Sequence, residues 1–171
     1  MLKKYFTEEE YDSLQASNDL LFKTLELVIK LFEGKTDKGG LPYLNHLMKV
    51  YAGVSDYQEK IIALLHDVVE DTDVTYEDLK EFGYSEDIIE ALTYLTKKKG
   101  EYYPDYIERI INSDNKLALE VKLADLTHNI DINRIKDPSV NDYERVTKRY
   151  IPAYNKILNK LDSMKKGEIK C

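Results

Sequence analysis

The chain has 171 residues, with 25 Lys+Arg against 32 Asp+Glu, so its formal net charge is −7. This length fits one domain, since domains cluster at roughly 100–200 residues. A hydrophobic share of 43% and a charged share of 33% exclude a disordered chain. The negative charge argues against a protein built to bind a nucleic-acid backbone, and the scarcity of Gly and Pro argues against a turn-rich all-β fold.

The sequence also predicts where the protein works. Its one cysteine, Cys171, is the last residue, so no intramolecular disulfide can form and we expect a solvated terminal thiol. The N-terminus has no apolar run and turns acidic quickly, unlike a signal peptide. No apolar stretch approaches the ~18 residues that cross a bilayer. We therefore expect a cytoplasmic protein with no nucleic-acid and no membrane partner. The sequence assigns no oligomeric state.

Helical patterns occupy the first half of the chain. Thr7 and Glu10 form a predicted capping box, and apolar residues recur at helical spacing to about residue 33, with a split at Asn18–Asp19. After a Gly/Pro-containing loop over 34–43, a short helix is expected over 44–53. A further capped helix should begin after Asp56 and run to Val69. That helix is apolar on nearly every side, so it should be buried.

The second half continues in the same way. Helices are expected over 76–83, capped by Thr75, over 85–97, from Pro104 to about 111, and over 115–133. Asp137-Pro138 breaks the chain, and a last helix should cover 141–165, with a kink at Pro152. The prediction is one all-α domain over 1–171, a helical bundle whose motif-bearing core spans about 20–135.

Three histidines stand next to carboxylates or amides. His66 and Asp67 fall inside the most apolar helix, and no Lys or Arg lies between residues 60 and 80 to neutralise the carboxylate. A buried carboxylate without a partner costs several kcal/mol, so a metal cation is the better candidate. His46 and Asp125, on other predicted helices, could complete the ligand set. Two His with two Asp suit Mn²⁺, Fe²⁺, Co²⁺, Ni²⁺ or Zn²⁺.

Further polar residues follow these candidates at helical spacing. Glu70 and Asp71 come four residues after His66 and Asp67, so they could position a water or move protons. His128 and Asn129 follow Asp125 by three and four residues and could contact a substrate. Each residue taken singly is more often a core histidine or a solvated acid. The joint pattern favours a site.

Three strings resemble a known family. GKTDKGGLPYLNH, ALLHDVVEDTDVTYEDL and VKLADLTHNID are similar to motifs of the HD superfamily of metal-dependent phosphohydrolases. The closer resemblance is to the hydrolase domain of RelA/SpoT-type alarmone enzymes and their small single-domain relatives. It implies an all-α HD-type bundle, a Mn²⁺ cofactor, and removal of pyrophosphate from the ribose 3′ position of ppGpp or pppGpp.

The resemblance also implies roles for individual residues. The metal ligands would be His46, His66, Asp67 and Asp125, and the catalytic acidic pair would be Glu70 and Asp71. Residues that match positions lining the nucleotide pocket are Lys122, His128 and Asn129.

The loop before Pro42 departs from the family pattern. The family has an Arg-Lys pair there, whereas this chain has Lys35-Thr36-Asp37-Lys38. Lys35 and Lys38 would stand in for that pair in substrate binding, and Asp37 is unfavourable beside phosphates. The histidine after the loop is followed by Leu47 instead of the usual proline. These changes leave the metal site intact and the choice of nucleotide open.

A second stretch, over 93–109, is basic and then aromatic. It could meet a phosphate and a base through Lys97, Lys98, Lys99, Tyr103, Tyr106 and Arg109. The alternative is a solvated lysine loop whose tyrosines close over the core.

Two other functions remain open from the sequence. The same metal site could act on another nucleotide: a nucleoside monophosphate, a dNTP or a cyclic nucleotide. The chain could also be a non-catalytic nucleotide-binding module with a structural metal. The pair Glu70-Asp71 argues against the latter, because a structural ion has no use for extra carboxylates beside it.

Overall fold

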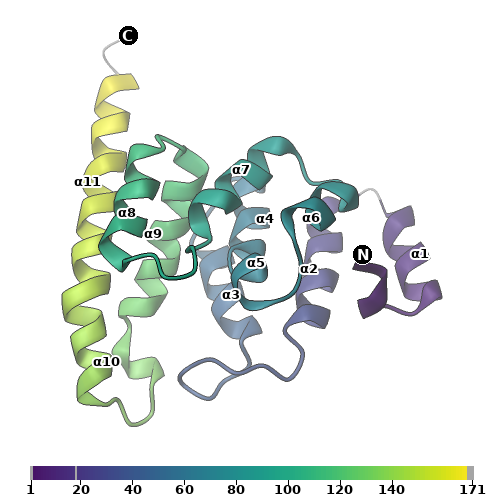
Figure 1. Cartoon of the computed structure of the whole chain (residues 1–171), viewed down its shortest axis with the longest axis horizontal. Helices are drawn as coiled ribbons and strands as arrows, with labels where there is room; N and C mark the ends of the chain where they lie inside the picture. The colour runs from purple at the N-terminus through teal and green to yellow at the C-terminus, as the bar shows by residue number, and fades with distance from the viewer. Residues whose placement is uncertain (1, 18, 169–171) are drawn as a thin grey trace.

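The computed structural model describes residues 2–17 and 19–168, and its regular structure is helical (Figure 1). The first half contains η1 (Leu2–Tyr5), α1 (Glu8–Ala16), α2 (Leu20–Leu31), α3 (Leu44–Ala52), α4 (Tyr57–Leu65), α5 (Val68–Asp71) and α6 (Tyr76–Phe82). The second half contains α7 (Glu86–Leu95), α8 (Tyr103–Asn112), α9 (Lys116–Ile130), η2 (Ile132–Arg134), α10 (Val140–Arg145), η3 (Val146–Tyr150) and α11 (Ile151–Glu168). The predicted all-α fold is confirmed. The expectations for Asn18 and Cys171 lie outside the described residues.

Local sequence signals place most helix ends. Three predicted capping boxes are present, Thr7/Glu10, Asp56/Glu59 and Thr75/Asp78. In each, the cap side chain and the third residue of the helix bond each other's backbone N–H, which satisfies donors that lack helical partners. Gly83 ends α6 with a φ of 110°, a left-handed conformation that favours glycine. Pro104 occupies the first turn of α8.

The predicted helix from Asp56 to Val69 is wrong at one point, because the structure breaks it at His66 and Asp67. α4 ends at Leu65, and α5 begins only at Val68. The His66 ring bonds the carbonyl of Ala63 through Nδ1 at 2.8 Å, and the side chain is buried. The break lets two consecutive side chains point toward the same centre, which adjacent residues of a regular helix cannot do.

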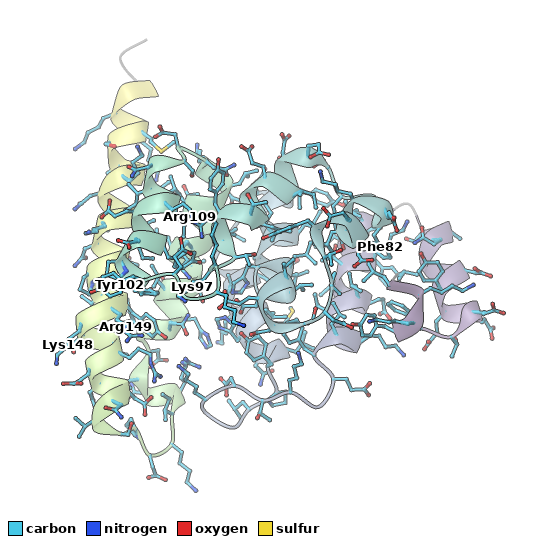
Figure 2. All side chains as sticks on the ribbon, viewed as in Figure 1. Phe82, Lys97, Tyr102, Arg109, Lys148 and Arg149 are labelled. Atoms are coloured by element: carbon cyan, nitrogen blue, oxygen red, sulfur yellow. The ribbon has the colours of Figure 1, made fainter. Side chains whose placement is uncertain are left out.

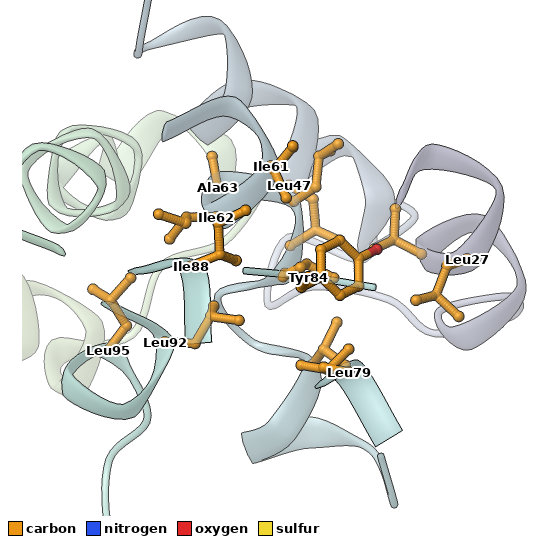
Figure 3. Packing of buried hydrophobic residues seen from close by; sticks show 14 of the residues in the cluster. Leu27, Leu47, Ile61, Ile62, Ala63, Leu79, Tyr84, Ile88, Leu92 and Leu95 are labelled. Carbon is orange, nitrogen blue, oxygen red and sulfur yellow. The ribbon is translucent and has the colours of Figure 1, made fainter. Parts of the chain in front are cut away.

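The bundle is organised around α9. A core of buried apolar residues joins α2, α3, α4 and α7 (Figure 3). One face of α9 adds Ala118 and Val121 to this core. Another face adds Leu119 and Leu126 to a second cluster, which α8 and α11 complete. Helices α1 and α11 lie at opposite ends of the long axis (Figure 1). No helix among the described residues is both long and apolar enough to cross a membrane.

The last helical stretch differs from its prediction in extent and shape. It runs over 140–168 without interruption, whereas the prediction covered 141–165, and Ser139 caps it through Asp142. Residues 146–150 form a wide π turn just before Pro152. Proline has no N–H for the regular helical bond, so the hydrogen-bond pattern of the helix is interrupted at this point. Tyr150 belongs to this turn.

Candidate metal centre and cavity

Four side chains from three parts of the chain converge at one point. The Nε2 atom of His46, on α3, lies 3.3 Å from Nε2 of His66 and 3.3 Å from Oδ1 of Asp125, on α9. The Oδ2 atom of Asp67 lies 3.4 Å from His46 Nε2 and 3.0 Å from His66 Nε2. The ligand atoms of His46, His66 and Asp125 all lie within 4.8 Å of one another, and the three residues are buried. The fold thus brings together the four side chains that the sequence predicts as metal ligands.

Hydrogen bonds to the outer ring nitrogens orient both histidines. Nδ1 of His66 faces the Ala63 carbonyl, so it carries the proton and leaves Nε2 free. Nδ1 of His46 lies 2.7 Å from Nδ1 of His128. If His46 donates there, its Nε2 is also free. Such outer bonds fix the tautomer and the ring direction of metal-binding histidines.

The two carboxylates are held in the same way. The Tyr43 hydroxyl donates to Oδ2 of Asp67 at 2.6 Å. The Lys122 ammonium donates to Oδ2 of Asp125 at 2.8 Å, and the Asn129 amide donates to Oδ1. Lys122 and Asp125 both have nearly buried side chains. Asp125 can therefore stay ionised inside the bundle, although burial alone would oppose it.

The pKa shifts of the four clustered residues show that this site favours positive charge. Burial lowers the pKa of His66, but the carboxylates of Asp67 and Asp125 outweigh it and raise the pKa to about 10. Burial raises the pKa of Asp67, but His66 and His46 outweigh it and hold the pKa well below its usual range. Without a cation, these carboxylates favour protonated imidazoles; a bound divalent cation would take the place of the Nε2 protons. Two imidazole nitrogens and two carboxylate oxygens then form the mixed donor set of a divalent transition metal. The residues therefore fit a divalent cation.

A cavity of about 440 Å³ opens beside this cluster. Glu70 and Asp71 of α5 line it, together with Asp67 and Asp125. Partial burial raises the pKa of Glu70, and the bond from the Lys97 N–H offsets part of that rise. Partial burial and the nearby Asp67 also raise the pKa of Asp71. A carboxyl group with a raised pKa is better able to donate and accept protons near neutral pH.

The predicted substrate-binding residues lie in three different places. Lys38, Lys122 and Asn129 line the cavity. Lys35 is not among the lining residues, and its ammonium donates to the backbone carbonyl of Asp71 at 2.6 Å. His128 is not among the cavity-lining residues; it lines a neighbouring groove of about 680 Å³, and its Nδ1 lies 2.7 Å from the outer nitrogen of His46.

Arg134 is a cavity residue that the sequence analysis missed. Its guanidinium donates to Oδ2 of Asp37 at 3.0 Å and to the Asn129 side-chain oxygen at 3.1 Å. Asp37, which looked unfavourable beside phosphates, is thus neutralised, and its Oδ1 accepts from the N–H groups of Gly39 and Leu41. No local pattern marks Arg134, because its partner lies 97 positions away.

Gly39 is required by the close approach of this loop to Arg134. A Cβ atom at position 39 would lie 2.3 Å from the backbone oxygen of Arg134, which is well inside van der Waals contact. The loop 34–43 therefore rests directly on the chain that follows α9.

The basic and aromatic stretch has mixed roles. Lys97, Tyr103 and Tyr106 line the cavity. Tyr150 of the π turn, which the sequence analysis also missed, lines it as well. Lys98 and Lys99 are not among the lining residues. Arg109 bonds backbone carbonyls and Glu101, and Tyr106 is buried and bonds the Leu95 carbonyl. Lys97, Tyr102 and Arg149 also line a groove against α11 (Figure 2).

The chain is similar in sequence to curated proteins named as (p)ppGpp hydrolases. No family model matches the chain. The chain is 36% identical over 111 residues to the bifunctional (p)ppGpp synthase/hydrolase SpoT of Escherichia coli, a match that covers 57% of this chain and 16% of that protein. It is 28% identical over 155 residues to the guanosine-3′,5′-bis(diphosphate) 3′-pyrophosphohydrolase of Borreliella burgdorferi, covering 82% of this chain and 23% of the relative. The chain thus spans less than a quarter of the length of these relatives.

A solved structure shares the fold. It is described as a metazoan ortholog of SpoT that hydrolyzes ppGpp, and it matches with a TM-score of 0.65 and 23% sequence identity. The match covers 85% of this chain and 88% of that chain, so it extends well beyond the metal centre. In sequence and in fold, the chain resembles the hydrolase domain of the RelA/SpoT-type alarmone enzymes.

Proposed function

We propose that the chain is a Mn²⁺-dependent phosphohydrolase that removes pyrophosphate from the 3′ position of ppGpp or pppGpp. The observation that carries this proposal is the convergence of His46, His66, Asp67 and Asp125 beside a cavity that also holds Glu70 and Asp71. The names of the relatives support the substrate class.

The roles of the residues follow from the geometry. His46, His66, Asp67 and Asp125 would hold the cation, which polarises a phosphoryl oxygen and lowers the pKa of water when bound. Glu70 and Asp71 orient the attacking water and take up its proton. Asn129 and Lys38 contact the substrate from the cavity wall. Lys122, His128 and Tyr43 act through the ligands they bond: they hold Asp125, His46 and Asp67 in place.

The test is a product assay. Purified protein with Mn²⁺ and ppGpp should yield GDP and pyrophosphate, separated by ion-exchange chromatography, and the products should vanish with EDTA or with Asp67→Ala. If Asp67→Ala kept both metal binding and full activity, the assignment of the site would be wrong. No turnover by wild-type protein with Mn²⁺ confirmed bound would refute the substrate assignment.

Another nucleotide is the second candidate, and the loop over 35–38 favours it. Lys35 is bonded to Asp71, and Asp37 is bonded to Arg134. Of the two loop lysines, Lys38 alone lines the cavity, so the loop offers one cation there to phosphate groups. Release of orthophosphate from a nucleoside monophosphate, with no turnover of ppGpp, would favour this candidate.

A further inference from the structure

The C-terminal end of α7 is closed by two side chains of α8. The Arg109 guanidinium donates through Nη1 to the carbonyls of Thr93 and Tyr94, at 3.1 and 3.2 Å, and through Nη2 to that of Thr96, at 3.0 Å. The Tyr106 hydroxyl donates to the carbonyl of Leu95 between them. The last carbonyls of a helix have no helical partner, and here four consecutive ones are satisfied from one neighbouring helix.

Arg109 also holds the loop that follows α7. Its Nε and Nη2 atoms make a two-pronged ion pair with Glu101, at 2.8 and 2.9 Å. The second oxygen of Glu101 accepts from the Lys98 N–H at 2.9 Å. Arg109 therefore fixes both the start and the end of the loop over 96–101. A guanidinium presents five N–H donors in a fixed plane and can make all of these bonds at once, whereas an ammonium has only three donors on a single nitrogen.

One backbone N–H of the loop over 96–101 bonds a carboxylate that lines the cavity. The backbone N–H of Lys97 donates to Oε2 of Glu70 at 3.1 Å. Lys97 lies directly after Thr96, whose carbonyl Arg109 holds. The direction of the Lys97 N–H is thus set by the same peptide segment that Arg109 bonds. Figure 2 labels Arg109, on α8, and Lys97, in the loop that follows α7.

From this arrangement we propose that Arg109 is a positioning residue, which acts through the Lys97 amide to orient the carboxylate of Glu70. Arg109 does not line the cavity, so it cannot touch the substrate there. This role rests on the proposed function, in which Glu70 orients the attacking water. Because a catalytic group displaced by about 1 Å can cost up to a hundredfold in rate, loss of Arg109 should lower kcat without removing the cation.

The first experiment is a double-mutant cycle. Arg109→Lys, Glu70→Ala and the double variant are compared with wild type for ppGpp hydrolysis, under single-turnover conditions where rates are low. Mn²⁺ affinity is measured by calorimetry. The matched control is Glu108→Gln, on the same helix, whose carboxylate pairs with Lys156 of α11 instead of the loop. Glu101→Gln serves as a milder second variant if Arg109→Lys folds poorly.

The proposal expects Arg109→Lys to lower kcat roughly tenfold or more, with Mn²⁺ affinity within twofold and Glu108→Gln unchanged. In the Glu70→Ala background the same substitution should change the rate less than twofold. An equal loss in both backgrounds, or a wild-type kcat in Arg109→Lys, would overturn the proposal.

A second readout does not depend on activity. Hydrogen exchange at the Lys97 amide should quicken in both Arg109→Lys and Glu70→Ala, and stay slow in Glu108→Gln. If wild-type protein turned over no ppGpp, the proposed function would fail while this measurement still decided the positioning. An unchanged hydrogen-exchange rate at the Lys97 amide in Arg109→Lys would refute the positioning role of Arg109.

Discussion

The Nδ1 atoms of His46 and His128 lie 2.7 Å apart, so one imidazole must donate to the other. Burial and the neighbouring His46 lower the pKa of His128, which suits a neutral acceptor. His128 then fixes the proton of His46 on Nδ1 and leaves Nε2 directed at Asp67 and Asp125. A residue that the family resemblance assigns to the nucleotide pocket thus bonds the outer nitrogen of a predicted metal ligand.

This relationship predicts the effect of His128→Ala. Outer partners of metal-binding histidines typically contribute 10- to 100-fold to metal affinity, so we expect Mn²⁺ affinity to fall by about that factor. Competition with a chelator measures it. Thr127→Ala is the control, because the Thr127 hydroxyl bonds the Leu123 carbonyl of its own helix and no other group among the described residues. An affinity within twofold of wild type in His128→Ala would contradict the role.

Lys122 should be costly to remove. Its ammonium is the main cation beside buried Asp125, and removal of one partner of a buried ion pair costs about 3–5 kcal/mol. We expect Lys122→Met to lower the free energy of unfolding by about 3 kcal/mol in EDTA, measured by urea titration. Lys148→Met removes an exposed pair with Glu144 and should cost less than about 0.5 kcal/mol. Equal losses in the two variants would contradict this view.

Gly39→Ala tests the contact between the loop 34–43 and Arg134. The added Cβ would collide with a backbone oxygen, so the loop must shift, and we expect a loss of about 1–3 kcal/mol in unfolding free energy. The displaced loop should also separate Asp37 from Arg134. Gly167→Ala is the control: open space surrounds that position in α11, and alanine favours helices over glycine. A stable Gly39→Ala variant would show that the contact is dispensable.

The pair of Glu101 and Arg109 makes stability depend on acid pH. The Arg109 guanidinium, with the Lys98 N–H, lowers the pKa of Glu101 to about 2, from an ordinary 4.5. A lowered folded-state pKa contributes stability that is present above pH 4.5 and is lost as the pH falls toward 2. At pH 7, Glu101→Gln should therefore lose about 1.5 kcal/mol. Thermal melts should show this difference shrinking between pH 4.5 and 2, and a constant difference would contradict the assignment.

Much of the fold could be predicted because its signals are local. Capping boxes such as Thr7/Glu10 and the apolar periodicity of α7 act within a few residues. The predicted helix through His66 and Asp67 failed because the break depends on contacts with α3 and α9, which no window around α4 contains.

The sequence by itself determined most of the helices, their caps and the residue types that can hold a metal, because these depend on spacing along one segment. Only the tertiary structure decided which polar groups share a cavity. In the folded chain Lys35 bonds the Asp71 carbonyl, and His128 bonds the outer nitrogen of His46. Arg134 pairs with Asp37, and Tyr150 lines the cavity. The physical reason is that hydrogen bonds and ion pairs between distant segments form only where packing has already placed their partners, and periodicity carries no record of them.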